Sequence, residues 1–280
     1  MISFRIPKWV EKHNFEYSGA DDLSDEFYFE IRKKIKKLSS NTPEVSIIVP
    51  VWNEEKSIAR MISSIAELKT KYKTEILFIN NNSTDRTQDV LDRCGVTSIF
   101  QPIQGISITR QTALMAAKGK YILSADSDSI YPQGWVDAYA DVLQDGSIAC
   151  AYGSYSFLPP EGTSRFAMSV YEMFAESLFA LRRKRRGYLN VMGFNSAYRK
   201  DYALKIGGYN LKRTIWEDGW MALQLMKLGK LKFTSDKNAR VWTESRRLMD
   251  DGGVAGAFSK RLQKEYSRIY EYVFPKEQRL

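Results

Sequence analysis

Short apolar runs rich in β-branched residues alternate with segments of helical periodicity from residue 45 onward. The run "VSIIVPV" at 45–51 indicates a strand buried on both faces, and Ile58, Ile62 and Ile65 follow it at helical spacing. The alternation continues with strands at 74–79, 96–101 and 120–126 and with helices at 83–95 and 106–119. Short strand–helix–strand connections predict an α/β fold, a Rossmann-like, doubly wound and mostly parallel sheet with helices on both faces.

The chain is expected to form one two-part domain at 45–245, flanked by an N-terminal helical extension at 1–44 and a C-terminal basic, amphipathic segment at 246–280. The halves of the domain are 45–130 and 131–245. In the extension, apolar residues at helical spacing predict a helix that packs on the domain with its lysines outward. The helix after the second strand is expected to begin at Ser83 or Thr84, which are good N-cap residues. The other expected elements are strands at 147–153, 231–235 and 239–245 and helices at 163–186, 200–209, 217–231 and 254–272.

Composition and charge narrow the function. A net charge of +9 over 280 residues favours anionic partners. The single histidine, His13, excludes histidine triads and histidine-rich zinc sites, so acid–base chemistry falls to Asp or Glu and any metal to carboxylates. Two cysteines make no disulfide framework, and no apolar run reaches the roughly 20 residues of a membrane span. A cytoplasmic protein is expected, either soluble or peripheral at the inner face of the membrane.

Three strands of the predicted sheet end in polar residues. The first runs into Trp52-Asn53-Glu54, the second into 80–85, and the third into Asp126-Ser127-Asp128. In open α/β sheets, ligands bind beyond the carboxyl ends of the strands. In an extended chain the two aspartates would project together and would need a counter-charge. A metal, a basic side chain or water could supply it, and such a crevice suits a nucleotide bound through a metal ion.

Five collinear segments resemble family 2 glycosyltransferases of the GT-A fold. They are "VSIIVPVWNEE", "EILFINNNSTDRT", "GISITRQTALMAAKGKYILSADSD" with its DxD motif, "MGFNSAYRKDYALKIGGYN" and "WEDGWMALQLMKLGKLKF". The resemblance implies a GT-A fold with a nucleotide-binding half at 45–130 and an acceptor half at 131–245. It implies inverting transfer of a sugar from a nucleotide sugar to a hydroxyl of a glycan or lipid-linked saccharide.

The resemblance also implies roles for the carboxylates. Asp128 would bind Mg²⁺ or Mn²⁺ on the donor diphosphate, and Asp126 would hold the ribose or assist the metal. Asp218 would be the general base, and Glu217 would position the acceptor or tune Asp218. The two acids could equally mark a helix N-terminus, where the helix dipole favours negative charge.

Further residues are implied in binding the donor. Those expected to line its site are Pro50, Val51, Trp52, Asn53, Glu54, Asn81, Asp85 and Ser127. Arg110 would face the phosphates or the base, and Arg246 and Arg247 would clamp the diphosphate. A UDP donor is expected, but where the family commonly has aspartates that accept the N3–H of uracil, this chain has Asn80 and Asn81. An asparagine can still accept through its carbonyl but can also donate, so GDP and CDP stay open. Trp52 could instead be a packing residue, Asn81 and Asp85 turn or cap residues, and the arginine pair a solvated helix start.

Two rival classes remain. A nucleotidyltransferase would carry a glycine- and Lys/Arg-rich loop after the first strand, whereas "PVWNEEKS" has no glycine. A nucleic-acid-binding protein would spread basic residues and exposed aromatics over one face, whereas the cations here concentrate at 182–186 and in the C-terminal third. No nucleic-acid partner is therefore expected. The run at 182–186 is either a solvated surface or a contact with anionic lipid.

Overall fold

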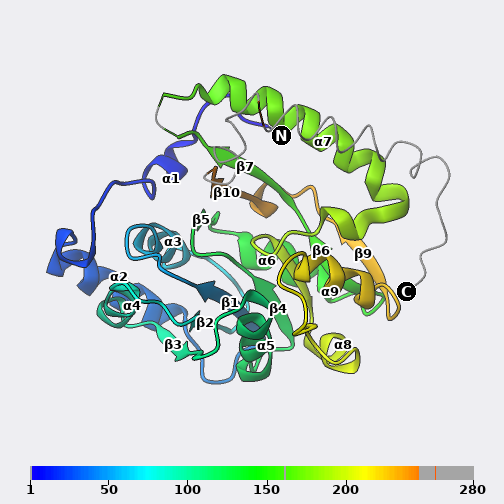
Figure 1. Ribbon diagram of the computed structural model, residues 1–280, viewed down its shortest axis with the longest axis horizontal. Helices are drawn as coiled ribbons and strands as arrows, with labels where there is room; N and C mark the ends of the chain where they lie inside the picture. Colours follow the sequence, from blue (N-terminus) through cyan, green and yellow to red (C-terminus); the bar gives the residue numbers. More distant parts are fainter. Residues whose placement is uncertain (1, 161, 246–255, 257–280) are drawn as a thin grey trace.

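The computed structural model describes residues 2–160, 162–245 and 256, and its centre is a seven-stranded sheet of order β3-β2-β1-β4-β8-β6-β9 (Figure 1). Its strands are β1 (Val45–Val51), β2 (Thr74–Asn80), β3 (Thr97–Phe100), β4 (Tyr121–Ser124), β6 (Ile148–Tyr152), β8 (Ser196–Arg199) and β9 (Lys230–Phe233). Neighbouring strands run parallel except at β8, which is antiparallel to both β4 and β6. The mostly parallel sheet that the sequence predicts is confirmed.

The central strand β1 explains why both faces of the sheet are covered. All seven of its residues are buried, and their side chains alternate between the two faces. Val45, Ile47 and Val49 belong to one hydrophobic core, whereas Ile48 belongs to the other. One core is covered by α2 (Asp25–Leu38), α3 (Ile58–Ile65), α4 (Thr87–Cys94) and α6 (Trp135–Leu143), and the other by α5 (Ile106–Ala116), α8 (Lys200–Lys205) and α9 (Glu217–Leu225). The predicted doubly wound arrangement is therefore confirmed.

A second sheet of three strands lies beside the first (Figure 1). It consists of β5 (Ser129–Ile130), β10 (Arg240–Glu244) and β7 (Ser154–Leu158), with the long helix α7 (Arg165–Arg186) against β7. Because β5 begins directly after Asp128, this sheet adjoins the end of β4. Three short 3₁₀ helices complete the described elements: η1 (Ala20–Asp22), η2 (Gly187–Asn190) and η3 (Lys237–Ala239).

The N-terminal residues pack on both sheets. Val10 of α1 (Lys8–Glu11) joins Ile130 and Trp242 in a small core on the second sheet. Ile31 and Ile35 of α2 enter the main core, while the lysines of α2 point outward. The prediction that this helix packs on the domain is confirmed.

Some expected boundaries differ from the structure. The helix after β2 begins at Thr87, not at Ser83 or Thr84, because residues 80–86 form a hydrogen-bonded loop. β7 and β8 were not predicted. The helix expected at 254–272 lies outside the described residues except at position 256. Within the described part of the chain, no helix is both long and apolar enough to cross a bilayer.

Replacement of Ile31 by alanine tests how firmly α2 is built into the core. Ile31 is buried, so Ile31→Ala should lower the free energy of unfolding by about 2–5 kcal/mol, whereas Phe29→Ala on the exposed side of the same helix should change it by less than about 1 kcal/mol. Urea denaturation measures both. Equal effects of the two substitutions would show that α2 does not contribute its apolar face to the core.

Candidate active site

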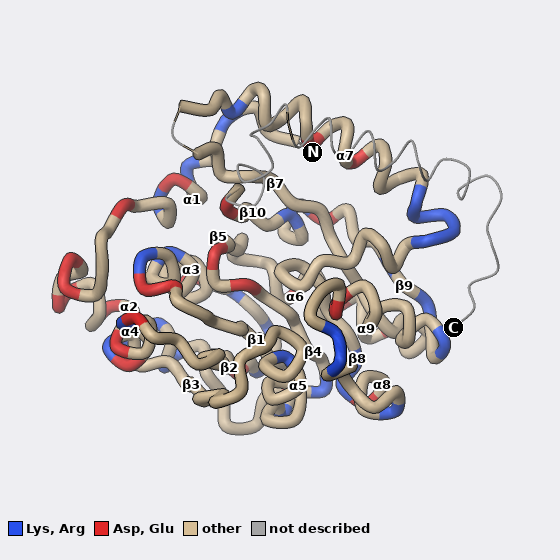
Figure 2. The backbone as a smooth tube through the Cα atoms, in the orientation of Figure 1, with Lys and Arg blue, Asp and Glu red and all other residues tan. Residues whose placement is uncertain are grey.

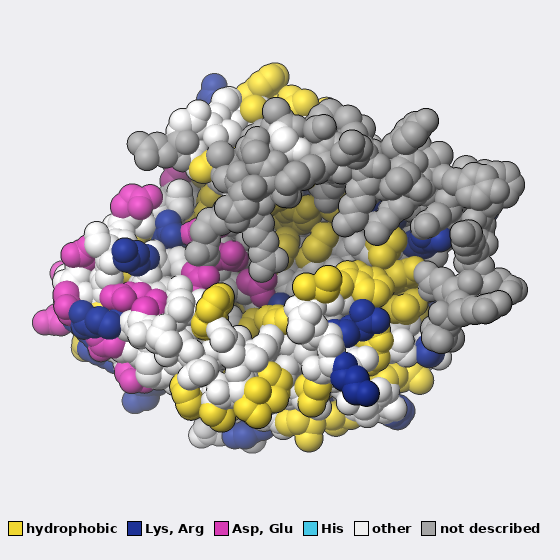
Figure 3. Space-filling view, viewed as in Figure 1, with side chains coloured by type: hydrophobic (Ala, Val, Ile, Leu, Met, Phe, Trp, Pro, Cys, Tyr) yellow, Lys and Arg dark blue, Asp and Glu magenta, His cyan; other side chains and the backbone are white. Residues whose placement is uncertain are grey.

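The three polar strand ends lie side by side, because β2, β1 and β4 are neighbours in the sheet. Acidic side chains gather near the middle of the face in Figure 3, over the ends of β1, β4 and β5. The sequence segments quoted for these ends therefore meet at one edge of the sheet, as expected for strands that run parallel.

The loops after β1 and β2 are joined by hydrogen bonds. Asn53 Oδ1 accepts a bond from Thr84 N at 2.8 Å, and Asn53 N donates to Ser83 Oγ at 3.0 Å. Asn53 and Asn82 have positive φ angles of 52° and 56°, a conformation that asparagine tolerates better than most residues. The asparagines of these loops therefore stabilise the conformation of the loops themselves.

Asn81 and Asp85 are also held inside the protein. Asn81 Oδ1 accepts a bond from Gly105 N at 2.9 Å. Asp85 Oδ1 accepts from Thr87 N, and Asp85 Oδ2 accepts from Glu55 N. These contacts are those of turn residues, so hydrogen bonding within the protein accounts for both positions without a ligand.

The other residues expected around the donor divide into buried and exposed. Pro50 and Val51 are buried within β1, and Val51 packs in the main core. Trp52 is 53% exposed, so it is not a packing residue. Glu54 accepts a bond from Ser57 Oγ, and its backbone N donates to Thr87 Oγ1 at 2.8 Å. Of Pro50, Val51, Trp52 and Glu54, Trp52 is the most exposed to solvent.

Asp126 and Asp128 have different partners. The chain leaves the strand after Ser124 and turns at Ser127 and Asp128, so the alternation expected of an extended chain does not apply. The backbone amide of Asp126 donates to Tyr131 Oη at 2.9 Å, and its carboxylate faces Arg110. Asp128 Oδ1 accepts bonds from Ser129 Oγ at 3.2 Å and from Thr243 Oγ1 of β10 at 3.4 Å. Ser127 is buried between them.

Arg110, in the middle of α5, is the counter-charge of Asp126. Its Nη2 lies 2.8 Å from Asp126 Oδ1, and its Nε lies 3.4 Å from Glu217 Oε1 and 3.3 Å from Asp218 Oδ1. The guanidinium is buried and also donates to Ser124 Oγ. The expectation that Arg110 faces the phosphates or the base stays a prediction; its described ion pairs are with carboxylates from two distant segments.

Glu217 and Asp218 form the first turn of α9, where the helix dipole favours acids. The residue before them, Trp216, has a φ of 59°, which is rare for a bulky side chain and requires support from the surrounding structure. Its indole lies against Gly219, where a β-carbon would overlap it, and packs edge-on against Tyr188. A strained residue thus positions the acid pair.

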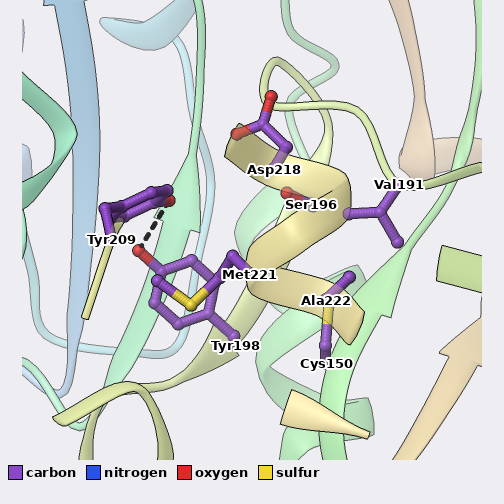
Figure 4. A pocket seen from close by; sticks show the side chains of 8 residues that line it. All are labelled: Cys150, Val191, Ser196, Tyr198, Tyr209, Asp218, Met221 and Ala222. Atoms are coloured by element: carbon purple, nitrogen blue, oxygen red, sulfur yellow. Dashed lines mark hydrogen bonds between the residues drawn. The ribbon is translucent and has the colours of Figure 1, made fainter. Parts of the chain in front are cut away.

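Asp218 is poorly solvated, with 18% of its side chain exposed. It lines a cavity of about 10 Å³, room for about one water molecule, together with Cys150, Val191, Ser196, Tyr198, Tyr209, Met221 and Ala222 (Figure 4). Burial raises the pKa of Asp218 to about 8; Arg110 opposes the shift, and the negative charges of Glu217 and Asp126 add to it. A carboxyl with such a pKa can hold or accept a proton near neutral pH.

The segment "MGFN" contributes residues to which the sequence analysis gave no role. A β-carbon at Gly193 would overlap both Arg110 Nη2 and Asp218 Oδ2, so this position must be glycine for the pair to meet. Tyr131 Oη donates to the carbonyl of Phe194 at 3.0 Å and so ties the turn after β4 to this segment. The glycine in the quoted motif is the one feature of the sequence that could have indicated this close contact.

The carboxylates fit a divalent cation only with help from a ligand. Arg110 supplies one positive charge against three carboxylates, and Asp128 lies two residues after Asp126, so the site holds excess negative charge and hard oxygen donors. Within residues 2–160 and 162–245, no group of three or more His, Cys, Asp or Glu side chains is arranged to hold a metal ion. A metal here would therefore need further oxygen ligands, such as those of a diphosphate. Arg246 and Arg247, expected to clamp that diphosphate, lie outside the described residues.

The pKa of Asp218 can be measured in the free protein. Its ¹³C-carboxyl resonance, assigned by its loss in Asp218→Asn, should titrate near pH 8, and ordinary aspartates should titrate near pH 4. Because the pKa is raised on folding, the protonated carboxyl stabilises the fold below pH 4, and this contribution is lost as the pH rises through about 8. The free energy of unfolding of the wild type should thus fall relative to that of Asp218→Asn over this range. A midpoint near pH 4 would contradict the assigned environment.

Comparison with known proteins identifies the family. The sequence model described as "Glycosyl transferase family 2" matches residues 46–207, more than half of the chain. An uncharacterised glycosyltransferase of Haemophilus influenzae is 23% identical over 219 residues, covering 72% of this chain and 87% of that protein. The UDP-Glc:α-D-GlcNAc-diphosphoundecaprenol β-1,3-glucosyltransferase WfgD of Escherichia coli is 30% identical over 119 residues, covering 41% of this chain and 46% of that protein.

The fold is shared with solved glycosyltransferases. The mannosyltransferase PcManGT from Pyrobaculum calidifontis, solved with GDP-Man and Mn²⁺, superposes with a TM-score of 0.57 at 17% identity over 85% of this chain and 72% of that chain. The fold of this chain, with helices on the two faces of a mostly parallel sheet, is the GT-A arrangement. The chain belongs to glycosyl transferase family 2, as the five collinear motifs predict.

Proposed function

We propose that this protein is an inverting glycosyltransferase that moves a sugar from a nucleotide-sugar donor to a hydroxyl of a glycan or lipid-linked saccharide. The observation that carries the proposal is the ion pairing of Arg110 with Asp126 on one side and with Glu217 and Asp218 on the other. One buried cation thereby brings the carboxylate at the end of β4 within a few ångströms of the acid pair of α9. Donor-side and acceptor-side groups of a transferase need this proximity.

Asp218 is the proposed general base. As the acceptor oxygen forms its bond to the anomeric carbon, the hydroxyl proton passes to the carboxylate of Asp218. The bond between the anomeric carbon and the diphosphate oxygen breaks on the opposite side, and the nucleoside diphosphate leaves with that electron pair. Attack opposite to the leaving group inverts the anomeric configuration. The raised pKa of Asp218 makes its ionised form a stronger base than an ordinary carboxylate.

Asp128, assisted by Asp126, is the proposed holder of Mn²⁺ or Mg²⁺ on the donor diphosphate. When bound, the ion would offset the negative charge that develops on the leaving diphosphate. The excess of carboxylates over cations supports this role. The exposed ring of Trp52 is suited to stack on the base, a contact that any nucleotide base can make.

UDP is the proposed nucleotide. WfgD is named as an enzyme that uses UDP-Glc, whereas PcManGT was solved with GDP-Man, so similarity alone does not select one base. Asn80 uses both ends of its amide within the loop: Nδ2 donates to Gln88 Oε1 and Oδ1 accepts from Ser83 N. Base selection is therefore assigned to other groups at this edge of the sheet. A lipid-linked acceptor is proposed from the acceptor in the name of WfgD.

The base assignment is tested with Asp218→Asn. This variant keeps the shape of the side chain but removes its basicity, so sugar transfer should fall by about 10²–10⁴-fold while the affinity for nucleotide sugar, measured by calorimetry, stays within a few fold. Glu217→Gln, a matched change at the preceding residue, should retain more activity than Asp218→Asn. Transfer by Asp218→Asn at the wild-type rate would remove Asp218 from the mechanism.

The metal and the donor are tested together. A panel of UDP-, GDP- and CDP-sugars is incubated with and without Mn²⁺, and donor hydrolysis and transfer are followed by chromatography. Activity should require the metal, favour UDP-sugars and give a β-linked product from an α-linked donor. Asp128→Ala should lose at least about tenfold in donor affinity in Mn²⁺, whereas Asp201→Ala, on exposed α8, should not. Full activity of Asp128→Ala would overturn the metal-binding role of Asp128. A product that keeps the α-configuration would overturn the inverting mechanism.

A further inference from the structure

The outer face of α7 exposes several apolar side chains, with the exposed Ser177 among them. Phe166, Val170, Met173 and Leu181 recur at helical spacing along this face and are 62%, 48%, 50% and 70% exposed. Phe4 stacks on Phe166 with ring centroids 5.8 Å apart and is itself half exposed. Figure 3 shows hydrophobic side chains at the upper edge of the molecule, where α7 begins. We call these four residues the α7 stripe.

Both acidic residues of α7 pair with arginines of the protein, Glu172 in a buried position and Glu176 in a partly exposed one. Glu172 forms a two-pronged ion pair with Arg165 at 2.7 and 2.8 Å and accepts a bond from Phe157 N. Glu176 pairs with Arg240 of β10. A surface helix usually turns its charges to the solvent and its apolar residues to the core. α7 also buries apolar residues such as Met168 and Phe179, but it exposes further apolar residues on its outer side.

Helix α2 provides the contrast within the same chain. Its apolar residues Ile31 and Ile35 are buried, and its lysines 33, 36 and 37 are exposed. It is thus an ordinary amphipathic helix whose charges are solvated. The outward apolar stripe is a particular feature of α7, and not a consequence of a shortage of polar residues in the chain.

The stripe ends in cations. Figure 2 shows a run of basic residues at the end of α7. Arg183, Lys184 and Arg185 are exposed there, and Arg183 stacks on Phe233 with its guanidinium 3.5 Å from the ring centroid. Arg182 is buried, so the run at 182–186 is not wholly solvated as one reading of the sequence had it. An apolar surface bordered by exposed cations matches the two layers of an anionic lipid surface, acyl chains below and phosphates above.

We propose that α7 lies in the plane of an anionic bilayer surface, with the stripe in the acyl-headgroup boundary and the cations at its C-terminal end against lipid phosphates. The stripe from Phe166 to Leu181 extends about 22 Å at 1.5 Å per residue, a length suited to lie along an interface. The proposal concerns membrane contact alone and does not depend on the reaction assigned to the active site.

Charge favours lipid over a second copy of this chain. Two copies joined in parallel through the stripe would bring their cationic ends together, and an antiparallel pair would set each cationic end on the apolar start of the other helix, where no described acidic residue of α7 faces outward. Anionic headgroups offer a negatively charged surface to the exposed side chains of Arg183 and Lys184. The basic end thereby selects the partner.

An environment-sensitive fluorophore on Val170→Cys tests the contact directly. Cys94 and Cys150 are buried, so the introduced thiol reacts selectively. Vesicles containing phosphatidylglycerol should shift the emission to the blue, and pure phosphatidylcholine vesicles should shift it less. The same probe on Lys36→Cys of α2 should not shift. Absence of a shift at position 170 would overturn the proposal, as would an emission that is already blue without vesicles and unchanged by them, because the face would then be covered in the free protein.

Charge neutralisation supplies the matched second arm. Lys184→Gln with Arg185→Gln should raise the concentration of phosphatidylglycerol vesicles needed for half-maximal binding roughly thirtyfold. Lys36→Gln with Lys37→Gln makes the same change of charge on α2 and should raise it less than about threefold. Equal losses would show that overall charge, not α7, attracts the vesicles. Analytical ultracentrifugation adds the remaining outcome, since a dimer that dissociates in Phe166→Ser, Val170→Ser and Met173→Ser would assign the stripe to a second copy.

Discussion

The site is organised by one buried guanidinium. Arg110 has almost no contact with solvent, and burial of an unpaired charge would cost several kcal/mol, so its carboxylate partners are a condition of the fold. Those partners come from the turn after β4 and from the first turn of α9, which lie far apart in the sequence. Gly193 leaves room for Arg110 and Asp218 to meet, because a β-carbon at this position would overlap both side chains. The position of the acid pair therefore follows from the need to neutralise Arg110.

The number of charges then determines the proton chemistry. Three carboxylates around one guanidinium would carry two excess negative charges if all were ionised. The protein reduces that excess by keeping a proton on Asp218, because burial raises the pKa of this carboxyl to about 8. A cation that entered beside the aspartates of the β4 turn would reduce the same excess by another route. Proton and cation thus compensate the same charge.

Sequence patterns predict the elements that are buried on both faces, and they do so for a physical reason. β1 and β2 contact apolar helices on either side and need uninterrupted apolar runs, which are visible without a structure. β8 has only "SAYR" and becomes a strand because β4 and β6 pair with it on both edges. Pairing of this kind leaves no periodicity in so short a segment.

The site was predicted unevenly for related reasons. The polar ends of neighbouring strands could be brought together from topology alone, and they do lie together. The direction of each side chain could not, because the chain turns at Ser127 and Asp128 instead of continuing the strand. The motif predicts that Arg110 faces the phosphates or the base, and this stays a prediction, whereas its ion pairs with the acids of α9 are tertiary contacts that no motif indicates.

The shared guanidinium also constrains how this sequence can diverge. If one carboxylate is removed, the guanidinium of Arg110 interacts with the remaining two. The effects of substitutions at Asp126 and Asp218 on the free energy of unfolding therefore cannot be independent of each other. A substitution of Arg110 itself would leave like charges facing one another in a poorly solvated space. The set of positions that can therefore change only together, although spread over more than a third of the chain, is Arg110, Asp126, Glu217 and Asp218, with Gly193 beside them.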